Sequence, residues 1–179
     1  MMMNNKSVVC GVVLLILTAM LSTALAQSTA IEWYNKGIDL FNNARYEEAI
    51  EAFDHALSAN PSYKDAWYNK GNALSRLGRH DEAIECYKEA IRLDPSYTDA
   101  WKNKGLALAD LGRYNEAIEC YNEAIRLDPN FKGAWNNKGV ALADLGRYNE
   151  RIPINLSSKT LYTYNTIINY EFFYKLGDV

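Results

Sequence analysis

The chain has 179 residues, with 19 lysines and arginines against 22 aspartates and glutamates, giving a net charge of −3 at pH 7. Hydrophobic residues make up 49% and charged residues 23%, an ordinary balance for a soluble domain once the N-terminal segment is set aside. The chain has no cluster of lysines and arginines, so nucleic acids and anionic membrane surfaces are poor candidates as partners.

The first 26 residues have the organisation of a secretory signal peptide. A short positive start, Met1–Lys6, precedes an apolar run at Val8–Leu21, and the small-residue pattern Ala24–Ala26 predicts cleavage before Gln27. The alternative is an uncleaved anchor, although the apolar run is short for the ~20 residues of a membrane span. Cleavage would leave 18 basic and 22 acidic side chains, a net charge of −4, because residues 1–26 carry only Lys6. We therefore expect an exported protein that touches a membrane only through an uncleaved segment.

From residue 30 onward the sequence repeats every 34 residues, and a fixed period of this length indicates stacked structural repeats. Residues 64–97 and 98–131 are identical at 24 of 34 positions. The predicted repeats are 30–63, 64–97, 98–131 and a partial unit, 132–150. The four tryptophans mark the period: Trp33, Trp67, Trp101 and Trp135.

Each unit predicts two helices, as the unit 98–131 shows. The first, Ala100–Leu111, carries one apolar face and should end at Gly112, because glycine accepts the left-handed conformation of a helix C-cap. The second, Tyr114–Leu127, should end at Asp128–Pro129, because proline disfavours helix at the preceding residue. The residues expected on the first apolar face are Trp101, Gly105, Leu108 and Leu111, with Gly105 and Ala117 small where the two helices approach.

This unit resembles the tetratricopeptide repeat, over about two thirds of the chain. The resemblance implies an all-α, right-handed superhelical solenoid of antiparallel helix pairs, with about three and a half repeats and a concave groove that binds proteins or peptides. The chain departs from the family where lysines stand at a usual leucine position, and we expect their stems to cover apolar surface while the ammonium groups reach water or an acid. The matching signature positions are Trp101, Gly105, Ala117, Tyr121, Ala124 and Pro129, and the lysines are Lys36, Lys70, Lys104 and Lys138.

No arrangement of side chains suggests catalysis, a cofactor or a metal site. Cys86 and Cys120 occupy equivalent places in neighbouring repeats, about 10 Å apart if the helices stack, which is too far for a disulfide. We expect both to be packing residues. His80 stands where other repeats have tyrosine and should pack likewise, whereas His55 should face solvent.

The groove is the candidate site, and helix phase predicts which residues of each first helix face it. An asparagine recurs there in every repeat, and its amide has both a donor and an acceptor. These asparagines either form a ladder that binds an extended peptide backbone or bond locally. Some tetratricopeptide grooves grip a C-terminal carboxylate with basic residues, but here Tyr34, Tyr68, Asp99 and Gly133 occupy those places. The candidate groove residues are Asn35, Asn69, Asn103, Asn137, Tyr34, Tyr68, Lys102, Asn72, Arg76 and Asp110.

The groove composition changes from apolar and aromatic in the first repeats to acidic at Asp99, Asp110 and Asp144. It therefore predicts a ligand segment with an apolar part and a basic part.

The fourth unit departs from the pattern at Arg151, and Pro153 should break its second helix. The tail 151–179 suggests a frameshift or a degraded gene end, although Leu161, Tyr164, Ile168 and Phe172 form a possible helical stripe. The segment Gly133–Leu145 would then act as a capping helix. We expect a non-catalytic scaffold that binds a peptide or protein. The alternatives are a repeat protein that self-associates through its C-terminal end into a homo-oligomer, and a truncated remnant.

Overall fold

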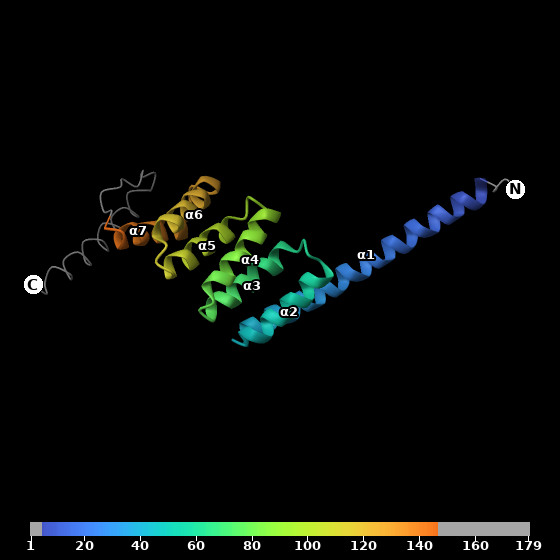
Figure 1. Ribbon diagram of the computed structural model, residues 1–179, viewed down its shortest axis with the longest axis horizontal. Coiled ribbons are helices and arrows are strands. Elements are labelled where there is room, and N and C mark those ends of the chain that lie inside the picture. Colours follow the sequence, from blue (N-terminus) through green and yellow to red (C-terminus); the bar gives the residue numbers. More distant parts are fainter. Residues whose placement is uncertain (1–4, 147–179) are drawn as a thin grey trace, which may run out of the picture. The chain divides into compact units, whose positions relative to one another are not determined.

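A computed structural model describes residues 5–146, with side chains from residue 16 onward. That part of the chain is entirely helical and contains no strand, as the repeat pattern predicted (Figure 1). It holds three helix pairs and the first helix of a fourth, about three and a half repeats. The helices are α1 (Asn5–Asn42), α2 (Tyr46–Ala59), α3 (Lys64–Arg76), α4 (His80–Leu93), α5 (Thr98–Asp110), α6 (Tyr114–Leu127) and α7 (Lys132–Asp144).

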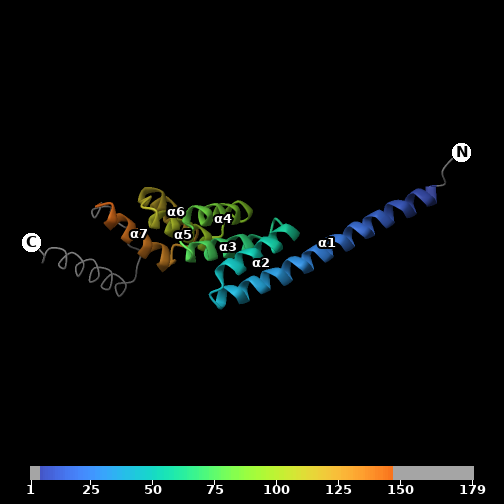
Figure 2. The same cartoon turned by 60° about the horizontal axis from the view of Figure 1, so that its bottom comes forward.

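Helix α1 joins the predicted signal segment to the first repeat without a break. Figures 1 and 2 both show its N-terminal half extending beyond α2. Large apolar side chains on this half, among them Met20, Leu21 and Leu25, are exposed. None of the helices in residues 5–146 is long and apolar enough to cross a membrane. Cleavage after Ala26 stays a prediction.

The helices pack in chain order. Helices α1 and α2, α3 and α4, and α5 and α6 form pairs, and each second helix also contacts the first helix of the next pair. Each first helix additionally contacts the next first helix, whereas no two second helices within residues 5–146 approach each other. The stack is therefore tighter along α1, α3, α5 and α7, which places these helices on the concave side.

The turn inside each pair requires a left-handed residue. Gly78, Gly112 and Gly146 have φ values of 75°, 74° and 68° there, which confirms the predicted cap at Gly112. The first repeat has Ala44 at the same position, with φ 58°, the only non-glycine residue with positive φ among those described. An L side chain is disfavoured in this conformation, so the first turn carries a strain that the others lack.

Small residues bring paired helices together. A Cβ atom on Gly71 would lie 2.7 Å from the Tyr87 ring, and one on Gly105 would lie 2.6 Å from the Tyr121 ring and 3.1 Å from the Ala117 carbonyl oxygen. Both rings are 1% exposed. The close approach predicted at Gly105 and Ala117 is thus confirmed. Leu111 was expected on the buried face, but α5 ends at Asp110 and the Leu111 side chain is 39% exposed beyond it.

The tail residues 147–179, with the predicted stripe from Leu161 to Phe172, lie outside the described residues. The predicted helix at Gly133–Leu145 is α7, which packs against α6 and α5.

Candidate functional site

We define the inner face as the side of α1, α3, α5 and α7 that carries the recurrent asparagines. The four asparagines occupy the same position on these helices, and all are at least partly exposed. The other predicted groove residues are likewise at least partly exposed, and their role in a binding groove stays a prediction. The remaining members are Tyr34, Tyr68, Asn72, Arg76, Lys102 and Asp110.

The two central asparagines bond to the preceding repeat. The Asn69 amide donates to the Tyr34 hydroxyl at 3.0 Å, and the Asn103 amide donates to the Tyr68 hydroxyl at 3.1 Å. Asn69 also donates to the backbone carbonyl of Asp65 at 3.0 Å. These amide groups hold one repeat against the next, and the local alternative describes them better than a ladder of free donors.

Asn72 joins these bonds into a network. Its carbonyl oxygen accepts from the Asn103 amide and from the Tyr87 hydroxyl, both at 2.9 Å. Its own amide donates to the Asn69 carbonyl oxygen at 3.3 Å. Burial raises the pKa of the Tyr68 and Tyr87 hydroxyls, so both stay neutral at physiological pH, with Tyr87 donating to Asn72 and Tyr68 accepting from Asn103. The inner face around α3 is therefore a connected polar surface whose donors and acceptors bond to one another.

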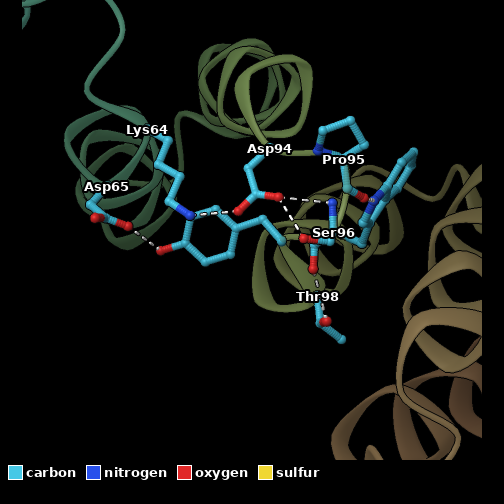
Figure 3. A network of polar contacts seen from close by, with 8 residues as sticks. Lys64, Asp65, Asp94, Pro95, Ser96 and Thr98 are labelled. Carbon is cyan, nitrogen blue, oxygen red and sulfur yellow. Dashed lines mark hydrogen bonds and ion pairs between the residues drawn. The ribbon is translucent and has the colours of Figure 1, made fainter.

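Aromatic rings extend this surface between repeats. The Tyr34 ring lies 4.8 Å from the Tyr63 ring, and the Tyr68 ring lies 4.9 Å from the Tyr97 ring. The Tyr97 hydroxyl donates to the Asp65 carboxylate at 3.0 Å (Figure 3). Burial, followed by the hydrogen bond to the Asp65 carboxylate and by its charge, raises the pKa of Tyr97. Each tilted ring pair joins a first helix to the residue that precedes the next first helix.

An ion pair lies at the same junction, where the Lys64 ammonium is 5.2 Å from the centre of the Tyr97 ring. Lys64 lies 2.5 Å from the Asp94 carboxylate, which also accepts from the Ser96 backbone and hydroxyl (Figure 3). The Lys64 ammonium and the Ser96 donors lower the pKa of Asp94 to about 2. The next repeat has Thr98 in place of Lys64, so Asp128 keeps the turn bond to the Asn130 backbone without this cation.

The polar network ends at α5. Lys102 takes the place of Tyr68, lies 2.9 Å from Asp99, and sits 5.2 Å from the centre of the Phe131 ring. Leu106 takes the place of Asn72 and is 45% exposed. The Tyr121 hydroxyl consequently makes no hydrogen bond to any residue between 16 and 146, although its ring packs on Gly105 as Tyr87 packs on Gly71.

The charge at the ends of the first helices also changes along the stack. The position is Asn42 in α1, Arg76 in α3, Asp110 in α5 and Asp144 in α7. Asp110 has no lysine or arginine partner in the described residues, and its carboxylate lies 3.6 Å from Nδ1 of His80. That nitrogen has no hydrogen-bond partner in the part of the chain that the structure describes, and His80 is half-buried at the expected tyrosine position.

The end asparagines differ from the central pair. Within residues 16–146, neither Asn35 nor Asn137 forms a side-chain hydrogen bond, because no neighbouring tyrosine hydroxyl reaches them. Asn137 would need a tyrosine at position 102, where Lys102 stands. The sequence signal for this difference was present in the identity of the residue 35 positions earlier.

The recurrent lysines lie over the tryptophans three residues before them. The Nζ atoms are 4.5 Å to 5.7 Å from the ring centres, and Lys70 also pairs with Asp54 at 2.5 Å. Their ammonium groups therefore interact with rings more than with acids, a cation–π contact that the sequence analysis missed. The pairs are Lys36–Trp33, Lys70–Trp67, Lys104–Trp101 and Lys138–Trp135.

The cysteines and His55 have structural surroundings. Cys86 and Cys120 are buried free thiols, as expected of packing residues, and burial raises the pKa of Cys86 to about 11. His55 is exposed and stacks on the Trp33 ring at 4.3 Å. Among the described residues, no group of three or more histidine, cysteine or acidic side chains is arranged to hold a metal ion.

Three family models, each described as a tetratricopeptide repeat, match the chain at residues 34–98, 98–131 and 120–152. Together they span 119 of the 179 residues and include the three complete helix pairs from Tyr34 onward. No curated protein sequence matches the chain.

Solved structures of similar fold include peptide complexes. The first TPR of Spaghetti (RPAP3) bound to the HSP90 peptide SRMEEVD is 28% identical, with a TM-score of 0.66, covering 67% of this chain and 95% of that one. The second TPR domain of human RPAP3 in complex with the HSP70 peptide SGPTIEEVD is 25% identical, with a TM-score of 0.61 and coverages of 66% and 97%. MamA is 26% identical, with a TM-score of 0.66 and coverages of 68% and 71%.

Proposed function

Because the chain belongs to the tetratricopeptide repeat family, we propose that it is a non-catalytic adaptor that binds a peptide segment of a partner protein on its inner face. The observation that carries this proposal is the alignment of α1, α3, α5 and α7 along one side of the stack. Relatives of this fold hold peptides, as the complexes with SRMEEVD and SGPTIEEVD illustrate.

The inner face is suited to an extended ligand. Its tyrosine and asparagine side chains offer donors, acceptors and ring surfaces that are held by hydrogen bonds before any ligand arrives. Such preorganisation lowers the entropy lost on binding. The side-chain amides of Asn35 and Asn137 form no hydrogen bond with residues 16–146, so a ligand backbone can pair with them.

An acidic C-terminal peptide of the kind bound by the RPAP3 domains is not the ligand that we propose. Tyr34 and Tyr68 occupy lysine places of the family's carboxylate grip, and both already form tilted ring pairs and hydrogen bonds with asparagines. Asp99 adds a negative charge to the same surface and already holds Lys102.

The experiment is panning of a random 12-residue peptide library against the full chain, followed by binding measurements on variants. The groove variant, Asn35→Arg with Asn136→Arg, adds bulk to two exposed inner-face positions. The control variant, Glu51→Arg with Glu119→Arg, adds the same residues at exposed positions of the second helices. Binding lost only in the groove variant supports the proposal, whereas equal binding by both variants would sink it.

We further propose that the protein is exported and that residues 1–26 are removed. The apolar side chains of this segment that the structure describes are exposed and contribute nothing to the repeat core. Mass spectrometry of the exported chain should find Gln27 at the N-terminus. An intact N-terminus would support the anchored alternative.

Self-association through the C-terminal end remains a second candidate. It is motivated by Val140 of α7, which is 62% exposed at the last described helix. Sedimentation at several concentrations tests it, and a concentration-independent monomer would argue against it.

A further inference from the structure

The inner face contains one place where the repeat pattern leaves both apolar surface and an unused hydroxyl. Leu106 of α5 and Val140 of α7 are equivalent residues, 45% and 62% exposed. The preceding repeat has Asn72 at this position, which is tied into the polar network. In the third and fourth repeats, two exposed apolar side chains on adjacent helices thus stand where the second repeat has a hydrogen-bonded asparagine.

Tyr121 supplies a second, independent observation at the same place. Its side chain is 1% exposed, and its hydroxyl forms no hydrogen bond within residues 16–146. The matching hydroxyl of Tyr87 donates to Asn72, and the residue equivalent to Asn72 in the third repeat is Leu106, which offers no acceptor. Burial raises the pKa of Tyr121, which keeps the hydroxyl protonated and available as a donor. Because this hydroxyl has no protein partner within residues 16–146, it can donate to an acceptor of a ligand.

The charge beside this surface is negative. Asp110 and Asp144 follow Leu106 and Val140 by one helical turn, and no lysine or arginine within the described residues pairs with either. Both acids are the last residues of their helices, where the helix dipole adds to the attraction for a cation. The equivalent residues of the first two repeats, Asn42 and Arg76, lack this charge.

From this arrangement we infer that the second half of the inner face, over α5 and α7, recognises an extended segment in which an apolar residue is followed two positions later by lysine or arginine. The inference rests on the proposed peptide-binding function and names its ligand. The apolar side chain covers Leu106 or Val140, the cation pairs with Asp110 or Asp144, and a ligand carbonyl accepts from Tyr121. One helical turn is about 5.4 Å and two residues of an extended chain about 6.6 Å, so the spacings correspond.

Three labelled peptides test this ligand class against the full chain: GSLSRSLSRG, a version with serine for each leucine, and a version with glutamate for each arginine. The first should bind at least about tenfold more tightly than the other two. Equal binding of all three, or tighter binding of the glutamate peptide or of SRMEEVD, would overturn the inference.

Variants that borrow residues from the second repeat locate the site. The exchange Leu106→Asn, Asp110→Arg, Val140→Asn and Asp144→Arg introduces the residues of Asn72 and Arg76 at equivalent places, so the fold should tolerate it. It should weaken binding of GSLSRSLSRG by about tenfold or more, and Tyr121→Phe by about threefold. The control Glu51→Arg with Glu119→Arg makes the same change of charge on the second helices, away from the inner face, and should alter binding less than about twofold.

The outcomes separate this inference from the function on which it rests. If the fourfold variant binds GSLSRSLSRG as the wild type does while Asn35→Arg with Asn136→Arg abolishes binding, the groove binds peptides but the inference is wrong. If neither groove variant affects binding, the proposed function is wrong as well. Circular dichroism of each variant must first show unchanged helix content.

Discussion

The two halves of the inner face have the same backbone and different surfaces. Around α3, tyrosines and asparagines bond to one another across repeats, and Asn72 joins three partners. Around α5, Lys102 and Leu106 replace the tyrosine and asparagine of the preceding repeat and end this network, and the Tyr121 hydroxyl has no hydrogen-bond partner within residues 16–146. Two substitutions on the same backbone therefore replace a surface whose polar groups bond to one another by one with an exposed apolar side chain and, within residues 16–146, an unpaired hydroxyl. Matched substitutions in the two halves test this difference.

The largest effect should come from packing, and it should be equal in both halves. Alanine at Gly71 or Gly105 places a methyl group within 2.7 Å of a buried tyrosine ring. Overpacking lowers the free energy of unfolding by about 3 kcal/mol at the upper end, whereas the higher helix propensity of alanine raises it by about 1 kcal/mol. The free energy of unfolding of each variant should therefore fall by about 2 kcal/mol. Urea unfolding measures this loss. A large loss in one half alone would show that the backbones also differ.

Removal of a buried tyrosine's hydroxyl should affect stability differently in the two halves. Tyr87→Phe removes the bond to Asn72 and should lower the free energy of unfolding by about 1 kcal/mol. Tyr121→Phe removes a hydroxyl without a bonded partner in residues 16–146 and should leave that free energy nearly unchanged. Equal losses in urea unfolding would mean that the second half holds its tyrosine as tightly as the first.

The turns inside the helix pairs allow the same comparison for backbone strain. Ala44→Gly should stabilise the chain by about 0.5–1 kcal/mol, because it relieves a left-handed alanine while loosening the unfolded chain. Gly112→Ala, with open space around the added Cβ atom, should destabilise it by about 1 kcal/mol. Thermal unfolding of both variants checks the opposite signs; a destabilised Ala44→Gly variant would contradict the assigned strain.

The smallest effect should depend on pH. The pKa of Asp94 is about 2 in the folded chain against 3.8 as an ordinary value, so its charge stabilises the fold above pH 3.8. Asp94→Asn keeps the turn, as Asn60 does in the first repeat, but loses the attraction to Lys64.

Because the pair is partly exposed, the loss at pH 7 should be below about 1 kcal/mol and should vanish as pH falls from 4 to 2. The matched control Asp128→Asn lacks a lysine partner and should show less of this dependence in acid unfolding. A difference between wild type and Asp94→Asn that grows toward pH 2 would contradict the assignment.

Much of the fold followed from the sequence because its signals are local. The second helix of the third repeat was predicted at Tyr114–Leu127 and has those bounds, and Gly112 has the left-handed cap that a helix stop requires. Leu111 was predicted on the buried face because the helical periodicity was extended through residue 111. Helix α5 ends at Asp110, so that periodicity does not apply to Leu111, and its side chain is exposed.

The site was less predictable because its contacts cross between repeats. Helix phase placed Asn69 and Asn103 on the inner face, but only the stacking of helices shows that Tyr34 and Tyr68 use their amides. The same holds for Tyr121, whose free hydroxyl is evident only when its neighbour is known to be Leu106 rather than asparagine.

The order of contacts along the stack has a consequence for how the molecule opens. No helix among α1–α7 contacts another more than two places away in the chain. Cooperativity in such an array passes from neighbour to neighbour, so the terminal units fray while the middle stays closed. Hydrogen exchange should therefore be slowest in α3 and α4 and faster toward α7, whose second-half surface would gain protection when a ligand spans α5 and α7.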